Sequence, residues 1–177
     1  MTKTIRIAGF GGQGVMLLGQ LLAYAATDQS LNSIWVPTYG PETRGGTANC
    51  ALTISDQAIY SPVFNQSDIL IALNEPSYQK FKEKINPGGR LYYNQSLIKT
   101  VDEQKDIKCI GVSINDIALS LGKIQVANMV MLGALLKEEK LFDDETIERV
   151  LRKLLGAKKE QMMDINLEAI KLGRQES

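Results

Sequence analysis

Apolar residues along the first two thirds of the chain fall into short strand-like runs separated by turns. Residues 4–8, 33–36, 47–55, 68–73, 90–93 and 107–112 alternate with polar residues or are apolar throughout, as strands do. Residues 13–27 and 75–85 carry apolar side chains at helical spacing, and further helical stretches follow at 114–121, 126–136, 143–155 and 158–172. This order of elements predicts parallel strands joined by crossover helices.

The fold we expect is therefore α/β: a Rossmann-like, mostly parallel sheet flanked by helices, with an inserted β-hairpin and C-terminal helices. Strand 33–36 should lie parallel to strand 4–8 through a right-handed crossover. Strand 47–55 should form the hairpin with residues 57–60, across Ser55 and Asp56. The length of 177 residues predicts a single domain over residues 1–177.

A glycine-rich turn joins the first strand to the first helix. Gly9, Gly11 and Gly14 have the GxGxxG spacing at the place where a strand gives way to a helix. Glycines there let the backbone approach a ligand closely, and the amides of the helix start attract an anion. Gln13 adds an amide that could reach a ligand or cap the turn. The alternative is a tight connection that binds nothing.

A second unusual loop covers residues 38–46 and contains one proline and three glycines. Arg44 could bind a phosphate or carboxylate through its guanidinium fork, Tyr39 could stack on a ring, and Glu42 could accept a hydrogen bond from a ribose, an amine or an arginine. In a Rossmann-like sheet this loop would reach the carboxyl edge, where the glycine turn also lies and where ligands bind. The alternative is a structural loop that introduces the hairpin.

Other positions have ordinary interpretations. Strand 33–36 ends in Pro37 and Thr38 without the acidic residue that holds the ribose in NAD sites, which argues against such a site. Asn74 precedes helix 75–85 and is typical of a helix cap. Asn128 and Gln125 could contact a ligand, although polar positions on helices usually face solvent. Cys50 is typical of a small buried strand residue.

Composition excludes several classes of function. The net charge is +0 and the pI about 6.3, so no basic surface for nucleic acid is expected. No apolar run approaches the roughly 20 residues that span a bilayer, and the N-terminal residues lack a signal-peptide pattern, so we expect a cytoplasmic protein. With no histidine and two separated cysteines, no catalytic triad, metal site or iron–sulfur cluster is expected. Such a chain binds something or contributes to an active site shared with other chains.

Two motifs together carry a resemblance to a known family. They are Gly9-Phe10-Gly11-Gly12-Gln13-Gly14-Val15 and Tyr39-Gly40-Pro41-Glu42-Thr43-Arg44-Gly45-Gly46. This pair resembles the gamma subunit, or gamma domain, of the 2-oxoacid:ferredoxin oxidoreductases, which include the pyruvate, 2-oxoglutarate, 2-oxoisovalerate and indolepyruvate enzymes. The resemblance extends over essentially the whole chain.

The resemblance implies a subunit that supports CoA-dependent oxidative decarboxylation of a 2-oxoacid to an acyl-CoA and CO2, with reduction of ferredoxin or flavodoxin. It implies CoA at or near this chain, and thiamine diphosphate and [4Fe-4S] clusters on alpha, beta or delta partner subunits. Gly9, Gly11, Gly12, Gln13 and Gly14 would form the cradle for CoA, and Tyr39, Glu42 and Arg44 would line the site or hold a subunit interface. No catalytic residue and no metal ligand is implied for this chain.

Two other functions remain open at this point. The chain could be a stand-alone nucleotide-binding protein that uses NAD or a flavin, or a purely structural subunit with an empty glycine turn. Which 2-oxoacid is used cannot be read from these residues, and an isolated subunit could form a homodimer.

Overall fold

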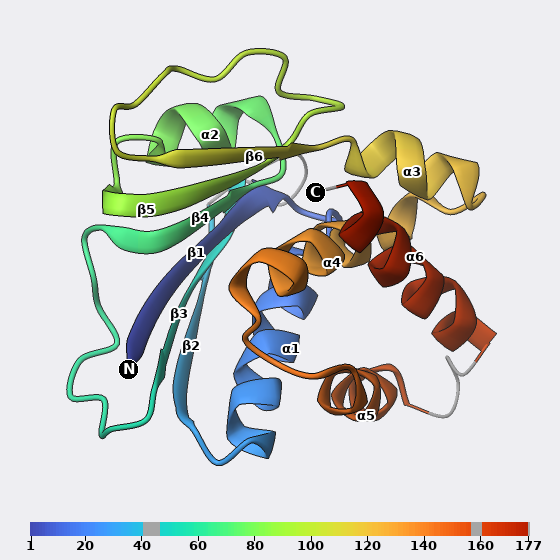
Figure 1. Cartoon of the computed structure of the whole chain (residues 1–177), viewed down its shortest axis with the longest axis horizontal. Helices are drawn as coiled ribbons and strands as arrows, with labels where there is room; N and C mark the ends of the chain where they lie inside the picture. Colours follow the sequence, from blue (N-terminus) through green and yellow to red (C-terminus); the bar gives the residue numbers. More distant parts are fainter. Residues whose placement is uncertain (41–46, 157–160, 177) are drawn as a thin grey trace.

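The computed structural model describes residues 1–40, 47–156 and 161–176. Within them, strands β1 to β6 form a sheet in the order β2-β3-β1-β4-β5-β6 (Figure 1). The strands are β1 Thr2–Phe10, β2 Asn32–Tyr39, β3 Thr47–Ser55, β4 Ser67–Ala72, β5 Ile85–Asn94 and β6 Lys108–Val112. The helices are α1 Val15–Asp28, α2 Glu75–Phe81, α3 Ile114–Ser120, the 3-10 turn Ile124–Val126, α4 Ala127–Glu139, α5 Asp144–Leu155 and α6 Met163–Glu176.

Five of the six described strands run in the same direction. β4 pairs in parallel with β1 and with β5, and β5 pairs in parallel with β6. β3 runs the other way: it is antiparallel to β1 from Thr2↔Ser55 to Phe10↔Thr47, and antiparallel to β2 on its other side. The predicted mostly parallel α/β sheet with C-terminal helices is therefore confirmed.

β2 runs in the same direction as β1, as predicted, but β3 lies between them. The predicted hairpin was wrong in its partner: β3 pairs with β2, while residues 57–60 form no strand. Burial gives the physical reason. β3 is covered along nearly its whole length, whereas β2 is half-buried only at residues 33–35 and exposed elsewhere. β3 therefore needs a neighbour on each side, and β2, which contains Pro37, suits an edge.

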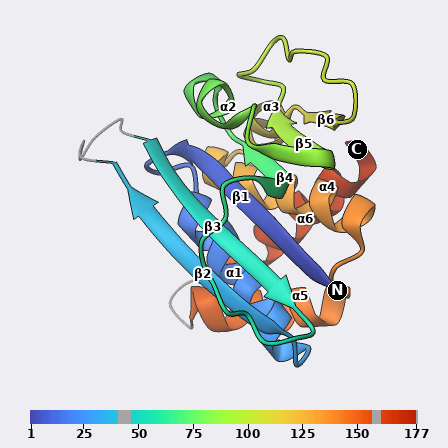
Figure 2. The same cartoon turned by 90° about the vertical axis from the view of Figure 1, so that its left-hand side faces the viewer.

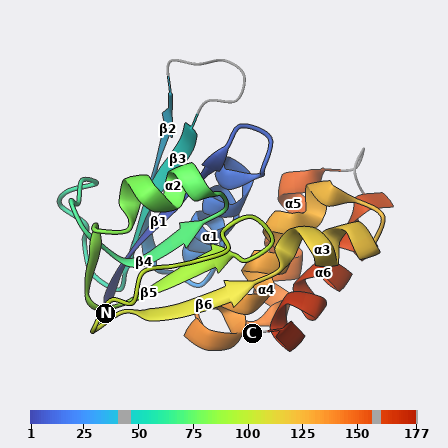
Figure 3. The ribbon, with the colours of Figure 1, turned by 90° about the horizontal axis from the view of Figure 1, so that it is seen from above.

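The helices cover the two faces of the sheet unequally. Ile5 and Ile7 of β1 face the large core that contains α1 and α4, while Ala8 faces a smaller cluster with Tyr78 of α2. Figures 1 and 3 show α2 on one side of the sheet and α1, α4 and α6 on the other. Figure 2 shows the segment between β3 and β4 crossing the face of β3 that is turned away from α1. The chain is thus a sheet with a thick helical layer on one face.

Two predicted boundaries differ from the structure. The helix predicted over 75–85 ends at Phe81, and Ile85 already pairs with Ser67 at the start of β5. Residues 86–89, which lie between the predicted helix 75–85 and the predicted strand 90–93, form an irregularity inside β5, where Gly88 has φ 77°. Residues 86–89 therefore extend the strand rather than precede it. The predicted start of the last helix at Lys158 lies outside the described residues.

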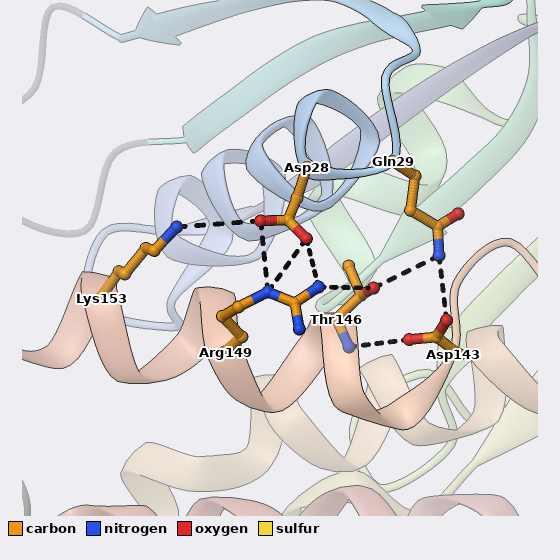
Figure 4. Close-up of polar contacts among 6 residues, drawn as sticks. All are labelled: Asp28, Gln29, Asp143, Thr146, Arg149 and Lys153. Carbon is orange, nitrogen blue, oxygen red and sulfur yellow. Dashed lines mark hydrogen bonds and ion pairs between the residues drawn. The ribbon is translucent and has the colours of Figure 1, made fainter.

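Polar contacts shown in Figure 4 fix α5 against the end of α1. Asp143 caps α5, because its Oδ1 accepts a hydrogen bond of 2.7 Å from the amide of Thr146. Gln29 lies just beyond α1 and donates to Asp143 Oδ2 at 3.4 Å. Arg149 pairs with Asp28, and this hydrogen bond holds the pKa of Asp28 below its usual value. Among the described residues, no helix is both long and apolar enough to cross a bilayer.

Candidate functional site

The glycine turn lies at a topological switch point of the sheet. β1 and β4 are parallel neighbours, and their carboxyl ends lie side by side at Ala8↔Ala72. From β1 the chain passes through residues 11–14 into α1 on the thick helical face, and from β4 it passes through Asn74 into α2 on the opposite face. Connections that diverge in this way leave a crevice between them, and ligands of open α/β sheets bind there.

Gly9 and Gly14 are required for packing. A Cβ on Gly9 would lie 2.8 Å from Gln13 Oε1 and 2.9 Å from Val15 Cγ2. Gly14 caps α1 in the left-handed region, with φ 78°, and a Cβ on it would lie 2.2 Å from Asn128 Nδ2. These two glycines let α1 and α4 approach the turn closely, so their presence alone does not indicate a ligand.

Gly11 and Gly12 are different, because the space beside them is open. Both are exposed, and a Cβ on either would have no other atom within 4 Å among the described residues. Gly12 has φ 93°, a conformation that L side chains rarely adopt. Gly11 has no such constraint, so a side chain there would meet no atom of the described residues and would cause no backbone strain. Gly11 and Gly12 therefore form the part of the turn that a ligand could approach; we call these two residues the open arc.

The start of α1 is suited to an anion. Its first helical hydrogen bond runs from the amide of Leu18 to the carbonyl of Gly14, at 3.0 Å. The amides of residues 15–17 precede that bond and lack intrahelical partners. Within the described chain, no side chain caps this end and its first turn contains no acidic residue. The partial positive charge at the start of α1 is thus not compensated by a carboxylate in the first turn of this helix.

Gln13 is held by contacts inside the protein. Its Oε1 accepts hydrogen bonds from the amide of Phe10 at 2.7 Å and from Asn74 Nδ2 at 2.8 Å. Its Nε2 donates to the carbonyl of Leu73 at 3.3 Å. The side chain therefore joins the glycine turn to the end of β4.

A line of neutral amides continues along the carboxyl edge of the sheet. Asn94, at the end of β5, is 0% exposed and donates through Nδ2 to the same Leu73 carbonyl at 3.1 Å and to Asn115 Oδ1 at 3.0 Å. Asn74 is 1% exposed and caps α2 by accepting from the amide of Ser77 at 2.9 Å. The connections after β1, β4 and β5 are thus tied together without a charged group.

Asn128 is a residue of this site whose environment the sequence interpretation misjudged. It lies in the first turn of α4, is 2% exposed and donates through Nδ2 to the carbonyl of Gly14 at 3.2 Å. The available signal was its setting, since it is an asparagine among the apolar residues of a helix that is buried over most of its length. A buried polar residue requires a hydrogen-bond partner. Gln125, in the 3-10 turn before α4, is exposed.

The second predicted motif is described only in part. Tyr39 ends β2 and is 71% exposed, and Glu42 and Arg44 lie outside the described residues. Tyr39 pairs with Ala48 and Phe10 pairs with Thr47, so β2 and β1 end at the same edge with β3 between them. Because β3 lies between them, the ends of β2 and β1 are separated by twice the distance between neighbouring strands, about 10 Å. The two motifs therefore lead to a common edge of the sheet.

Other chemistry near the turn is limited. Cys50 lies behind the start of α1, where its Sγ donates to the carbonyl of Val15 at 3.7 Å, and burial raises the pKa of this thiol to about 11. A thiol that stays protonated is a poor nucleophile and metal ligand. Among the described residues, no group of three histidine, cysteine, aspartate or glutamate side chains could hold a metal ion.

Comparison with known protein families gives a match over almost the whole chain. The model of the family described as pyruvate ferredoxin/flavodoxin oxidoreductase matches residues 4–176. The ketoisovalerate oxidoreductase subunit VorA of Methanothermobacter thermautotrophicus is 37% identical over 169 residues, which are 96% of this chain and 35% of that protein. The 2-oxoglutarate synthase subunit KorC of Methanocaldococcus jannaschii is 35% identical over 154 residues, which are 85% of this chain and 82% of that protein.

Solved structures agree with this match. A 2-oxoglutarate:ferredoxin oxidoreductase from Magnetococcus marinus, with 2-oxoglutarate, coenzyme A and succinyl-CoA bound, superposes with a TM-score of 0.90 at 28% identity, over 98% of this chain and 30% of that one. The gamma subunit of a keto/oxoacid ferredoxin oxidoreductase from Geobacter sulfurreducens has a TM-score of 0.83 at 27% identity, over 98% of this chain and 97% of that one. The chain thus spans about a third of VorA and of the Magnetococcus chain, but nearly all of the Geobacter subunit.

Proposed function

Because this chain belongs to the pyruvate ferredoxin/flavodoxin oxidoreductase family, we propose that it is the gamma subunit of a 2-oxoacid:ferredoxin oxidoreductase. The complete enzyme would convert a 2-oxoacid and CoA to an acyl-CoA and CO2, and would pass a pair of electrons to ferredoxin or flavodoxin. Thiamine diphosphate and [4Fe-4S] clusters would supply decarboxylation and electron transfer on alpha, beta or delta subunits. This chain would complete the assembly and help to hold CoA.

The observation that carries the CoA role is the open arc beside an uncapped helix start. Gly11 and Gly12 leave space for a ligand at the switch point, and the first amides of α1 follow directly. A phosphate of CoA is an anion of the kind that such amides bind. Gly9, Gln13 and Gly14 would shape this cradle, and Tyr39, Glu42 and Arg44 would line the same edge or an interface. The CoA-bound Magnetococcus enzyme supports this proposal.

The two alternative functions lead to different expectations. A dinucleotide site would use an acidic residue at the end of a strand beside β1, but the neighbour on that side is the antiparallel β3, and β2 contains no acidic residue. Tight binding of NAD by the purified chain would revive the stand-alone nucleotide-binding function. A purely structural subunit would tolerate a side chain in the open arc.

The cytoplasmic location, the single-domain description and a homodimer of the isolated chain stay predictions.

The first test is reconstitution. We expect partner subunits to reduce ferredoxin from a 2-oxoacid and CoA only when this chain is present, with pyruvate, 2-oxoglutarate and 3-methyl-2-oxobutanoate assayed in parallel. The relatives act on different 2-oxoacids by name, so this panel also identifies the substrate class. Equal activity without this chain would refute the proposal.

The second test replaces Gly11 by valine in the assembled enzyme. Gly11 has open space and no positive φ, so the substitution should leave folding and assembly unchanged. A β-branched side chain in the open arc should obstruct CoA and raise its KM about tenfold or more, equivalent to about 1.4 kcal/mol. Normal CoA kinetics in a normally assembled G11V enzyme would favour the structural alternative.

A further inference from the structure

The hydrogen-bonding capacity of the Gln13 carbonyl oxygen is filled by the protein itself. An amide oxygen has two lone pairs, and Oε1 accepts from the Phe10 amide at 2.7 Å and from Asn74 Nδ2 at 2.8 Å. The amide nitrogen of Gln13 is directed to the Leu73 carbonyl at 3.3 Å. These contacts use both lone pairs of Oε1 and one of the two Nε2 hydrogens, so the side chain fixes the turn that contains it.

Asn74 connects the two sides of the crevice. Asn74 is 1% exposed, whereas Gln13, which accepts one of its hydrogen bonds, is half-buried. Oδ1 accepts from the Ser77 amide and caps α2, while Nδ2 donates to Gln13 at the glycine turn. One amide therefore sets the start of α2 and the position of Gln13 together.

Asn128 holds the turn from the side of α4. Its Nδ2 donates to the Gly14 carbonyl at 3.2 Å, and its side chain occupies the space that a Cβ on Gly14 would need. Gly11 and Gly12 have no such neighbours among the described residues. The turn is thus fixed at both ends of the open arc and free in its middle.

We propose that Gln13 and Asn74 are positioning residues, which fix the open arc so that its backbone, and not the Gln13 side chain, receives an anionic group of CoA. This inference rests on the proposed function. The choice of amides follows from the chemistry of the site. Asparagine and glutamine donate and accept hydrogen bonds without a net charge, whereas a carboxylate at either position would repel the anion.

The test is Asn74→Ser in the assembled oxidoreductase. Serine is a good helix cap, so the cap of α2 is retained, but its hydroxyl is too short to replace Nδ2 at Gln13. We expect the KM for CoA to rise about tenfold, the effect of one lost hydrogen bond that is partly buried. The KM for the 2-oxoacid and kcat at saturating CoA should stay within about twofold. Asn32→Ser is the matched control, because Asn32 bonds to the Gln57 carbonyl at the far edge of the sheet and should change neither constant.

The double variant decides whether Gln13 acts through Asn74. If both residues position the turn together, Gln13→Ala with Asn74→Ser should raise the KM for CoA no more than the stronger single variant does. If the effects of the two single variants on the KM for CoA add in the double variant, the inference is overturned. It is also overturned if Gln13→Ala raises this KM and Asn74→Ser does not. Either result would show that Gln13 contacts CoA directly. Should Asn74→Ser fail to assemble, Asn74→Thr also keeps a neutral cap of α2 and removes the Nδ2 donor to Gln13, with the same rise in the KM for CoA expected.

Gly11→Val separates this inference from the function on which it rests. If G11V raises the KM for CoA and neither Gln13→Ala nor Asn74→Ser does, the turn binds CoA without needing these positioning residues, and the inference is wrong. If none of the three variants changes the KM for CoA, the proposed CoA role is wrong, and the inference that rests on it is wrong as well.

Discussion

Cys50 and Cys109 lie in opposite environments. Cys50 is 0% exposed in β3, and burial raises the pKa of its thiol to about 11. Cys109 is exposed on the edge strand β6, although partial burial raises the pKa of its thiol as well. Because the thiolate is the reactive form, Cys50 is protected both by lack of access and by protonation.

We expect Cys109 of the native chain to react with a thiol-specific disulfide reagent at about pH 8 and to release one equivalent of the reagent's thiolate. Cys50 should react, and release a second equivalent, only after denaturation. The measurement is the absorbance of the released thiolate over time. Cys109→Ser should remove the native reaction and leave the one that follows denaturation. Two fast equivalents from the native protein would contradict the burial of Cys50.

At the scale of elements, α4 and α6 pack closely against each other at two glycines, one on each helix. A Cβ on Gly133 of α4 would lie 2.0 Å from the Ile170 carbonyl oxygen, and a Cβ on Gly173 of α6 would lie 1.9 Å from the Val130 carbonyl oxygen. Each glycine faces the backbone of the other helix, which cannot rotate away as a side chain can. The distance between the two helices is therefore set by the absence of both Cβ atoms.

Gly133→Ala should destabilise the chain, although alanine normally favours a helix by about 1 kcal/mol over glycine. The helices must separate to admit the methyl group, and overpacking of this kind costs about 1–3 kcal/mol. The midpoint of chemical denaturation measures the effect. Gly11→Ala is the control: its Cβ meets open space, so stability should change little. Wild-type stability in G133A would show that α4 and α6 do not pack this closely.

The sequence predicted the elements better than their neighbours in the sheet. Alternation located β1 and β3, and a continuous apolar run located β4, because a strand that is buried on both faces has few polar positions. Neither pattern showed that β3 separates β2 from β1, since pairing order depends on contacts distant in the chain. The signal was present in Pro37, which is suited to an edge strand, and in the small uncharged residues of β3.

The candidate site was predicted in the same uneven way. The GxGxxG spacing located the turn, but it could not tell Gly11, which faces open space, from Gly9 and Gly14, which serve packing. That difference depends on Val15, Leu73 and Asn128, and the last is more than a hundred residues away. Local motifs predict backbone conformation well, whereas buried partners depend on tertiary packing.

At the scale of the whole molecule, the two edges of the sheet are held by different chemistry. Neutral amides tie the carboxyl edge, and a buried carboxylate ties the amino edge. Glu139, at the end of α4, has a side chain that is 1% exposed and pairs with Lys3 of β1 and with Arg90 of β5. It also accepts a hydrogen bond of 2.8 Å from the Tyr92 hydroxyl. α4 therefore runs from the glycine turn, at Asn128, to a charged anchor at the opposite edge.

Glu139 should make stability depend on pH. Burial raises its pKa, but the hydrogen bonds from Lys3, Arg90 and Tyr92 outweigh burial, so its pKa is lowered overall. A lowered folded-state pKa means that the stabilisation is complete above the unfolded-state value, about 4.3, and is lost as the pH falls through the folded-state value. The stabilisation contributed by Glu139 should therefore begin to fall near pH 4 and continue to fall at lower pH.

We expect Glu139→Gln to reduce the free energy of unfolding by about 2 kcal/mol at neutral pH. The figure is below that for a fully buried pair, because the side chains of Lys3 and Arg90 are 28% and 35% exposed and water can solvate them once the carboxylate is gone. Denaturation at neutral pH and at progressively lower pH measures the difference, which should shrink in acid as the wild-type carboxylate is protonated. The adjacent Glu138→Gln is the control, because Glu138 pairs with the largely exposed Lys108 and should contribute little. A difference between wild type and E139Q that stayed constant down to strong acid would show that the charge of Glu139 is not what anchors α4 to the sheet.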